Sequence, residues 1–157
     1  MNEEHQAYYR SEIGLIKIVG TEAGITFVGF IDEEPTDDLE THPCLKDCVE
    51  QLDEYFNGIR TDFSVKLQPQ GTEFQKQVWN QLIKIPFGET VSYKNIAEAV
   101  GNKKAVRAVG NANGKNNIVI IIPCHRVIGN NGKLVGYGSG LDRKQWLLDH
   151  EAKQNRS

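Results

Sequence analysis

The stretch IIPCHRVIG, residues 121–129, places a cysteine directly beside a histidine and an arginine. A thiolate is a nucleophile and an imidazole is a base that can generate it, so Cys124 and His125 form a candidate pair for covalent chemistry. The alternative is a buried, inert thiol, because apolar surroundings raise the pKa of a cysteine. The polar residues that follow favour the first interpretation, since His125 and Arg126 are costly to bury unless the chain enters a site there. Neighbours in an extended chain point to opposite faces, so His125 should reach the sulfur through a bend or a water.

The other two cysteines, Cys44 and Cys48, are predicted to be structural. Together with His42 they could supply metal ligands, but no fourth ligand at a suitable spacing follows them. Cysteine is among the residue types most often buried, so we expect both thiols to pack in a core. Three cysteines are too few for a disulfide scaffold, which favours free thiols in a reducing compartment and a cytoplasmic location.

A second candidate site is a pair of short helices joined by a tight turn. Ser92 should begin the first helix, YKNIAEAVG, and the second helix, KKAVRAVGNANG, should start at Lys103. The second helix combines basic residues with small ones, so its backbone can approach a ligand closely: Lys103, Lys104 and Arg107 with Ala105, Ala108 and Gly110. Such a helix-turn-helix is typical of DNA-binding proteins, although an ordinary solvated basic face would have the same composition.

Charge is divided unevenly along the 157 residues. Residues 1–70 carry 5 Lys and Arg against 15 Asp and Glu, a net charge of −10, whereas residues 71–157 carry 13 against 6, a net charge of +7. Two units with different partners would explain this division, and the basic unit is then the candidate for binding nucleic acid. Charge balance for solubility is the alternative. We predict an N-terminal domain over residues 1–70 and a C-terminal domain over residues 71–157.

The elements expected in the acidic half are a small sheet and one helix. Residues 1–31 predict a β-hairpin, with strands GLIKIVG and GITFVGFI around the turn TEAG. Apolar residues at helical spacing predict a helix over residues 43–58, which Asn57-Gly58 ends. Residues 62–67, DFSVKL, should form a third strand because apolar and polar residues alternate there.

The basic half is predicted to be mainly helical. A capping box of Thr72 with Gln75 should begin a helix that ends near residues 86–88. The aliphatic run 118–122 is expected to be a buried extended segment, and Asp142 should cap the last helix. The predicted fold class is therefore α+β, a small N-terminal antiparallel sheet with a helix followed by a mainly helical domain. No stretch approaches the roughly 18 apolar residues of a membrane span, so we expect no membrane partner.

Five segments, in order along the chain, together resemble the O6-alkylguanine-DNA alkyltransferases, also called methylated-DNA–protein-cysteine methyltransferases: GTEFQKQVW, IPFGETVSY, AVRAVGNANGKN, IPCHRVIGNNGKL and GYGSGLDRKQWLLDHE. The resemblance is dense from Gly71 to Glu151, weaker before it, and highly specific in its Pro-Cys-His-Arg-Val core. It implies an N-terminal sheet-and-helix unit and a C-terminal unit with the helix-turn-helix. It also implies a DNA repair protein that flips O6-alkylguanine, and also O4-alkylthymine, from duplex DNA. The alkyl group is then transferred irreversibly to the protein's own cysteine, one turnover per molecule and without a cofactor.

The resemblance implies a role for each residue that matches its motifs. Cys124 resembles the alkyl-accepting nucleophile, on which His125 acts through a water while Glu151 orients the imidazole. Asn116 matches the asparagine that braces the active-site turn, and Tyr93 matches the tyrosine that can donate a proton to the departing guanine. The pocket for the base is expected to include Pro123, Val135, Tyr137, Gly138 and Ser139.

The resemblance also implies how DNA is bound, which is in the minor groove of an alkylated duplex. Arg107 matches the arginine that enters the duplex where the target nucleotide was. Further contacts to DNA are expected from Ser92, Tyr93, Lys94, Asn102 and Lys104. The acidic N-terminal unit carries no sign of the zinc-bearing methyl sensor fused to some relatives, so we expect no metal. We also expect a monomer with no obligate protein partner.

Three positions depart from the family pattern: Asn117 where many relatives have proline, Val135 before Gly136-Tyr137, and Ser139 where glycine is frequent. They leave the chemistry intact but make the size of the pocket, and so the tolerance of alkyl groups larger than methyl, an open question. Two other functions are alternatives. A non-catalytic lesion binder of similar sequence would lack the cysteine, and a cysteine hydrolase or acyltransferase would turn over through a hydrolysable acyl-enzyme.

Overall fold

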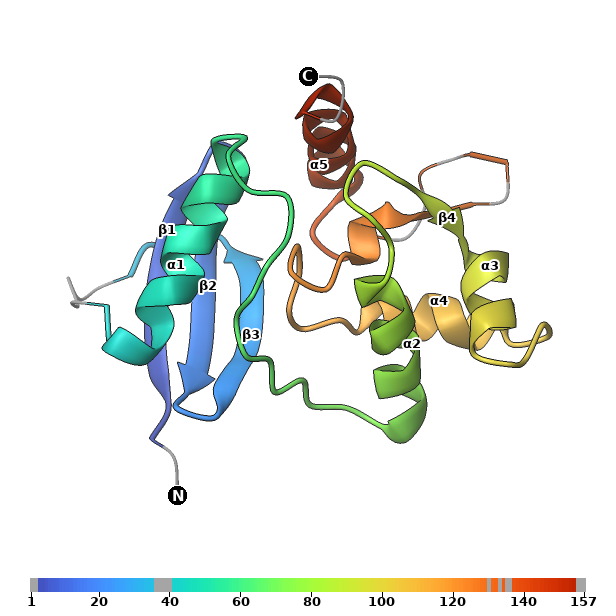
Figure 1. Cartoon of the computed structure of the whole chain (residues 1–157), viewed down its shortest axis with the longest axis horizontal. Helices are drawn as coiled ribbons and strands as arrows, with labels where there is room; N and C mark the ends of the chain where they lie inside the picture. Colours follow the sequence, from blue (N-terminus) through green and yellow to red (C-terminus); the bar gives the residue numbers. More distant parts are fainter. Residues whose placement is uncertain (1–2, 36–40, 130, 133, 135–136, 155–157) are drawn as a thin grey trace. The chain divides into compact units, whose positions relative to one another are not determined.

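The computed structural model describes residues 3–35, 41–129, 131–132, 134 and 137–154. The chain separates into two compact units, Met1–Gln70 and Gly71–Ser157 (Figure 1). Each unit has a buried apolar core. A sheet dominates the first unit and helices dominate the second, so the predicted α+β class is confirmed. Within the described ranges, no helix has both the length and the apolar character needed to cross a lipid bilayer.

The N-terminal unit is built on an antiparallel sheet with the order β1 (His5–Ser11), β2 (Gly14–Thr21), β3 (Gly24–Ile31). The predicted hairpin corresponds to β2 and β3. Because β2 is the central strand, its Ile16 and Ile18 are fully buried. The strand β1 is not predicted by the sequence pattern, since HQAYYRS is largely polar and pairs at one edge of β2.

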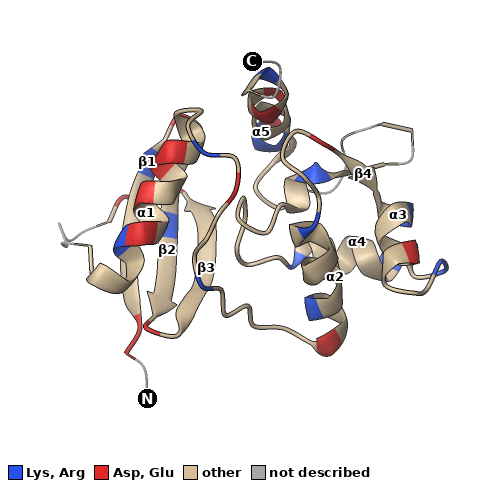
Figure 2. Ribbon diagram, in the orientation of Figure 1, with Lys and Arg blue, Asp and Glu red and all other residues tan. Residues whose placement is uncertain are grey.

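One helix covers a face of this sheet. The helix α1 (Pro43–Phe56) packs against β1 and β2 and follows the predicted apolar stripe, in which Leu45, Leu52 and Tyr55 are fully buried. Acidic residues occur along the same helix (Figure 2). The third predicted strand is wrong, because residues 62–67 pair with β3 only at one bridge, Ile25 to Leu67. The apolar residues of this segment are half-buried and the polar residues between them are exposed, as the alternating pattern predicted, although no strand pairing forms along it.

The C-terminal unit begins with three helices, α2 (Glu73–Ile83), α3 (Tyr93–Ala99) and α4 (Val106–Gly114). The predicted capping box is confirmed at α2, where Thr72 and Gln75 satisfy each other's backbone N–H groups. The helix α4 packs against both α2 and α3. Trp79 of α2 fixes that packing by donating from Nε1 to the carbonyl oxygen of Ala112 at 2.9 Å. The predicted pair of short helices is therefore α3 and α4, but α4 begins at Val106 and not at Lys103, because Lys103 and Lys104 lie in the turn between the two helices.

The rest of the unit is a series of turns, a short 3₁₀ helix η1 (Cys124–Arg126) and the helix α5 (Leu141–Gln154). A strand β5 (Val127–Ile128) follows η1 and pairs in parallel with β4 (Val91–Ser92). The prediction of an extended segment over residues 118–122 is wrong: the residues are buried as expected, but residues 119–121 form a turn and residue 122 a bend. The prediction that Asp142 caps the last helix is also wrong, because α5 begins at Leu141 and Asp142 lies in its first turn.

Candidate active site

Cys124 is the first residue of η1, and it is a free thiol that is only 3% exposed. Its backbone N–H donates to the carbonyl oxygen of Ile122 at 2.8 Å, which turns the chain sharply after Pro123. Burial raises the pKa of the thiol to about 11. Two neighbours act in the opposite direction and lower this pKa, the side chain of Asn116 and the positive charge of Lys144. The thiol is therefore protonated at rest and needs a base to become a nucleophile.

The amide side chain of Asn116 braces the turn that presents Cys124. Asn116 accepts from the N–H of Ile118 at 3.0 Å and donates to the carbonyl oxygen of Ile122 at 2.8 Å, so it joins both ends of the turn. Between those ends, Ile120 has a φ of 73°, a left-handed conformation that is strained for a β-branched residue. Backbone strain of this kind persists only where surrounding bonds enforce it, and it is concentrated at functional sites.

His125 follows Cys124 and is fully buried. Its Nε2 lies 2.6 Å from Oε2 of Glu151, whose pKa is lowered by the hydrogen bonds and charges of His125 and Arg126 although burial alone would raise it. Because a carboxylate can only accept, Nε2 carries the proton and donates to Glu151. Burial lowers the pKa of the imidazole, which leaves Nδ1 as an unprotonated base. Nδ1 has no hydrogen-bonding partner within the described part of the chain.

Arg126, which the sequence did not mark for a role, completes the surroundings of Glu151. Its Nε donates to Oε1 of Glu151 at 2.8 Å and its Nη2 donates to Oε2 at 3.1 Å, while Nη1 donates to the carbonyl oxygen of Ile85 at 2.7 Å. The N–H of Gly88 also points at Oε1, at 3.3 Å, from a turn where a φ of 82° requires glycine. The carboxylate thus connects α5 to η1 and to the turn after α2.

Lys144 is a second residue that sequence reasoning missed. It lies on α5 with no exposed surface, donates from Nζ to the carbonyl oxygen of Val127 at 2.6 Å, and stands 6.0 Å from the centre of the Tyr93 ring. Burial lowers the pKa of Lys144, and the nearby Cys124 raises it. Burial also raises the pKa of Tyr93, and the charge of Cys124 raises it further. A thiol, a lysine and a phenol therefore interact electrostatically at one place.

The residues expected to form the pocket are placed as follows. Pro123 and Tyr137 are buried, Ser139 is half-buried and Gly138 is exposed. Burial, followed by the charge of Cys124, raises the pKa of Tyr137 well above its ordinary value, so this tyrosine interacts with the thiol. Val135, also expected in the pocket, lies outside the described residues.

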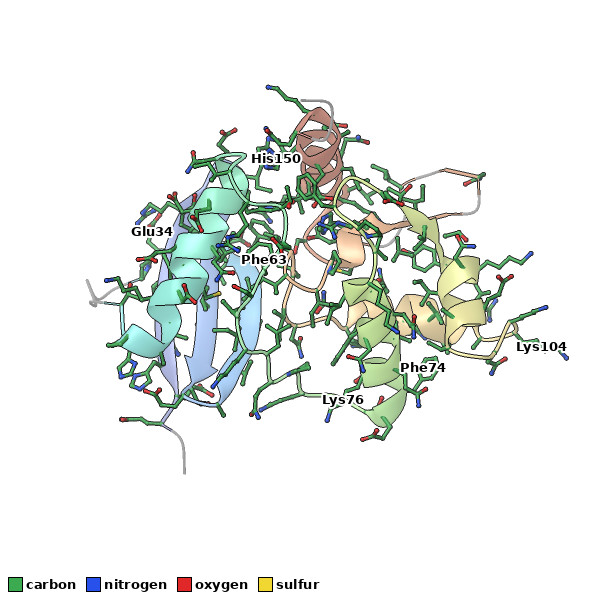
Figure 3. All side chains as sticks on the ribbon, in the orientation of Figure 1. Glu34, Phe63, Phe74, Lys76, Lys104 and His150 are labelled. Atoms are coloured by element: carbon green, nitrogen blue, oxygen red, sulfur yellow. The ribbon has the colours of Figure 1, made fainter. Side chains whose placement is uncertain are left out.

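The helices α3 and α4 carry the expected DNA contacts. Ser92 accepts from the N–H of Asn95 at 3.0 Å and so begins α3 with a capping box, which gives its hydroxyl a structural role. The other residues expected to contact DNA from this region include four with exposed side chains, Lys94, Asn102, Lys104 and Arg107, whereas Tyr93 is half-buried. Lys104 extends from the turn between the two helices (Figure 3). Figure 2 shows basic residues on α3 and in the turn that follows it, together with an acidic residue on α3.

Gly110 on α4 gives a further indication of a binding surface. A Cβ atom added there would meet no atom within 4 Å, and its backbone is not in the left-handed region. The fold therefore does not require glycine at this position, although glycine in a helix is less favourable than alanine by about 1 kcal/mol. Close approach of a ligand to the backbone of α4 would explain it.

A group of potential metal ligands occurs in the N-terminal unit. The structure adds His5 to the pair His42 and Cys44, and the three ligand atoms lie within 4.8 Å of one another. The two imidazole rings are stacked, however, with centroids 3.5 Å apart and planes 12° apart, so a shared ion would sit far out of both ring planes. Nδ1 of His42 already accepts from the N–H of Cys44 at 3.1 Å and caps α1. This geometry suits a helix cap better than a metal site.

Known proteins match both units. Residues 73–153 match the DNA binding domain of 6-O-methylguanine DNA methyltransferase, and residues 5–69 match its ribonuclease-like domain. A methylated-DNA–protein-cysteine methyltransferase of Methanosarcina acetivorans is 50% identical over 152 residues, which are 94% of this chain and 97% of the relative. The crystal structure of the Mycobacterium tuberculosis O6-methylguanine methyltransferase is 44% identical, with a TM-score of 0.86 over 97% of this chain and 94% of that one. The same bacterium's protein in complex with DNA has a TM-score of 0.84 at 43% identity, over 94% and 93% of the two chains.

Proposed function

The chain belongs to the O6-methylguanine DNA methyltransferase family, and from this premise we propose that it removes alkyl groups from the O6 atom of guanine in DNA by transferring them to Cys124. The observation that carries this assignment of the acceptor is the buried chain of contacts behind the thiol, from His125 to Glu151 to Arg126. The substrate is alkylated duplex DNA, bound by a monomer through the minor groove, and O4-alkylthymine is a second substrate.

The first step is removal of the thiol proton. Nδ1 of His125 is the available base, because its Nε2–H is directed at Glu151 and its low pKa keeps it neutral. The proton passes from Cys124 to Nδ1 through a water. The positive charge of Lys144 and the side chain of Asn116 then stabilise the thiolate, since both lower the pKa of Cys124.

The second step is displacement at a saturated carbon. The sulfur forms a bond to the alkyl carbon as the bond from that carbon to O6 breaks, so no oxyanion hole is needed. The departing guanine takes up negative charge, which Tyr93 neutralises by donating its hydroxyl proton. Lys144, 6.0 Å from the Tyr93 ring, stabilises the phenolate that remains. The product is a thioether, which water does not hydrolyse, so each molecule reacts once.

The base must leave the duplex before it can reach a buried thiol. The exposed basic side chains on α3 and α4 bind the backbone phosphates, and Arg107 occupies the gap in the stack. Phosphate contacts of this kind release counterions, so affinity should fall log-linearly as salt rises. An affinity that did not depend on salt would exclude this surface.

The experiment that tests the acceptor compares two buried cysteines. Cys124→Ala should abolish methyl transfer from an O6-methylguanine duplex while duplex binding persists, because the exposed basic surface is unchanged. Cys48→Ala is the matched control: Cys48 is also buried, at 1% exposure, and burial raises its pKa to about 12, but it packs in the core of the N-terminal unit. Transfer that survives Cys124→Ala would overturn the proposal, and release of product with repeated turnover would favour a cysteine hydrolase instead.

A further inference from the structure

A cavity of about 280 Å³ lies within the N-terminal unit. The β2–β3 hairpin, the first turns of α1 and the segment 64–66 supply its lining. Two thiols on α1, Cys44 and Cys48, both line it and both are free. The exposed residues Glu22 and Asp47 line it as well. The cavity thus joins two thiols and two carboxylates around a space that can hold a small organic molecule.

Cys44 has a base beside it. Its Sγ lies 3.1 Å from Nδ1 of His42, and the same nitrogen accepts a hydrogen bond from the Cys44 N–H at 3.1 Å. A ring nitrogen that accepts carries no proton, so Nδ1 can take the proton of the thiol. Cys44 is half-buried and lines the cavity, so a reagent in the cavity can reach its sulfur. Burial, followed by the charge of Glu22, raises the pKa of Cys44, and a cation beside Glu22 therefore favours the thiolate.

Cys48 is less accessible than Cys44 and cannot take its place. It is 1% exposed, and burial together with the charge of Asp47 raises the pKa of its thiol to about 12. Within the described residues its Sγ makes no hydrogen bond, so a buried, weakly polar atom lines the cavity without a partner. The two thiols are also poorly placed to join, because Cβ atoms four residues apart on a helix are about 5–6 Å apart and a disulfide requires about 3.5–4.5 Å. An adduct formed on Cys44 is therefore not displaced by Cys48.

The charges around the cavity determine which reagents it favours. Among the described residues neither Glu22 nor Asp47 forms an ion pair, and each raises the pKa of one of the two thiols. Lys66 also lines the cavity, but its charge is not a cause of the pKa shift of either thiol. A positive charge beside the thiols is therefore stabilised by the two carboxylates, and a negative charge is repelled by them.

We propose that this cavity is a site of covalent modification, at which Cys44 forms a mixed disulfide with a small aminothiol whose ammonium group lies beside Glu22 and Asp47. The aminothiol arrives as its symmetrical disulfide. Nδ1 of His42 takes the proton of Cys44, and the sulfur of Cys44 attacks one sulfur of the reagent. One S–S bond forms as another breaks, and the departing thiolate takes the proton from His42, so no further oxidant is needed. This modification is separate from methyl transfer and does not involve Cys124.

The test compares three small disulfides: cystamine, which is cationic, bis(2-hydroxyethyl) disulfide, which is neutral, and dithiodiglycolate, which is anionic. Intact-mass spectrometry measures the rate of adduct formation, and peptide mapping locates the adduct. Each rate is divided by the rate of the same reagent with N-acetylcysteinamide, which corrects for intrinsic reactivity. On this scale cystamine should modify Cys44 about tenfold or more faster than dithiodiglycolate, with the neutral disulfide between them. The preference should decrease as salt rises, and Cys44→Ala should remove the adduct.

The double variant Glu22→Gln with Asp47→Asn should reduce this preference to less than about threefold, because both negative charges are then gone. Lys66→Met is the matched control, since it also removes a charge from the lining but should not lower the preference. If the double variant does not fold, each single variant should show part of the reduction. Equal corrected rates for the cationic and anionic disulfides, a preference that persists without both carboxylates, or faster modification of Cys48 than of Cys44 would overturn the proposal.

Discussion

Replacement of Glu151 by glutamine should destabilise the C-terminal unit by about 3 kcal/mol. The carboxylate is 1% exposed. It accepts hydrogen bonds from Nε2 of His125 at 2.6 Å and from Nε of Arg126 at 2.8 Å. Removal of one partner from a buried ion pair typically costs about 3–5 kcal/mol, because the remaining charge stays buried without compensation. Glutamine keeps the shape and one acceptor oxygen, which places the expected loss at the lower end of that range.

Urea unfolding followed by tryptophan fluorescence measures this loss in the relevant unit, because both tryptophans, Trp79 and Trp146, lie after residue 70. The double variant Glu151→Gln with Arg126→Met should recover about 1–2 kcal/mol, since the unpaired guanidinium is then gone. Methyl transfer should stay low in both variants, because His125 has lost the carboxylate that fixes its tautomer. A loss of stability below about 1 kcal/mol in the single variant would refute this account of the carboxylate.

The lowered pKa of Glu151 also predicts how the effect of Glu151→Gln on stability depends on pH. The pKa of Glu151 is lowered by folding, so its contribution to stability is complete above the unfolded value of about 4.3 and is lost as pH falls towards the folded value. The difference in unfolding free energy between wild type and Glu151→Gln should therefore be constant from about pH 5 to 8 and shrink below about pH 4. A difference that did not change down to pH 3 would contradict the assignment of an ionised carboxylate.

Three further predictions concern the surfaces. Gly110→Ala should raise the unfolding free energy by up to about 1 kcal/mol and should weaken duplex binding. Melting curves measure the first effect and binding titrations the second. Unchanged binding would mean that α4 does not approach DNA at this position. Arg107→Ala should slow methyl transfer on duplex DNA far more than the reaction with free O6-benzylguanine, which needs no extrusion; equal losses would assign the arginine to the fold or the pocket. Added Zn²⁺ should leave the melting temperature unchanged, because the stacked rings of His5 and His42 do not converge on one point with Cys44; clear stabilisation would show that they rearrange around an ion.

Much of the fold could be predicted where local rules decide the structure. The capping box at Thr72 and the start of α3 at Ser92 follow from side chains that satisfy backbone N–H groups within one turn. The strand β1 and the turns before Cys124 depend on partners far away or on backbone strain. The left-handed Ile120 in particular contradicts the preference of its residue type, and that turn is held by the hydrogen bonds of Asn116 together with the backbone bond from Ile122 to Ile118. The apolar pattern of residues 118–122 therefore predicted their burial correctly but predicted an extended backbone where the chain turns.

The sequence pattern located the candidate nucleophile but not all of the groups around it. Lys144 and Glu151 are seven residues apart on α5, with buried Leu147 between them, so they share one face of the helix. That spacing is a signal from which Lys144 could have been found. Arg126 was indicated only as a polar residue that is costly to bury beside Cys124, and its contact with Glu151 could not be predicted because an arginine is ordinarily exposed. The packing of α2 and α5 against η1 is what buries Arg126.

The proposed mechanism requires that Cys124 accept one alkyl group and that the thiol not be regenerated. Intact-mass spectrometry after incubation with an excess of O6-methylguanine duplex tests it most directly, with peptide mapping to locate the change. The predicted result is a single addition of about 14 Da, confined to Cys124, after which repair stops with lesions remaining. Continued repair beyond one lesion per molecule, or a methyl group on Cys44 or Cys48 instead, would contradict the account.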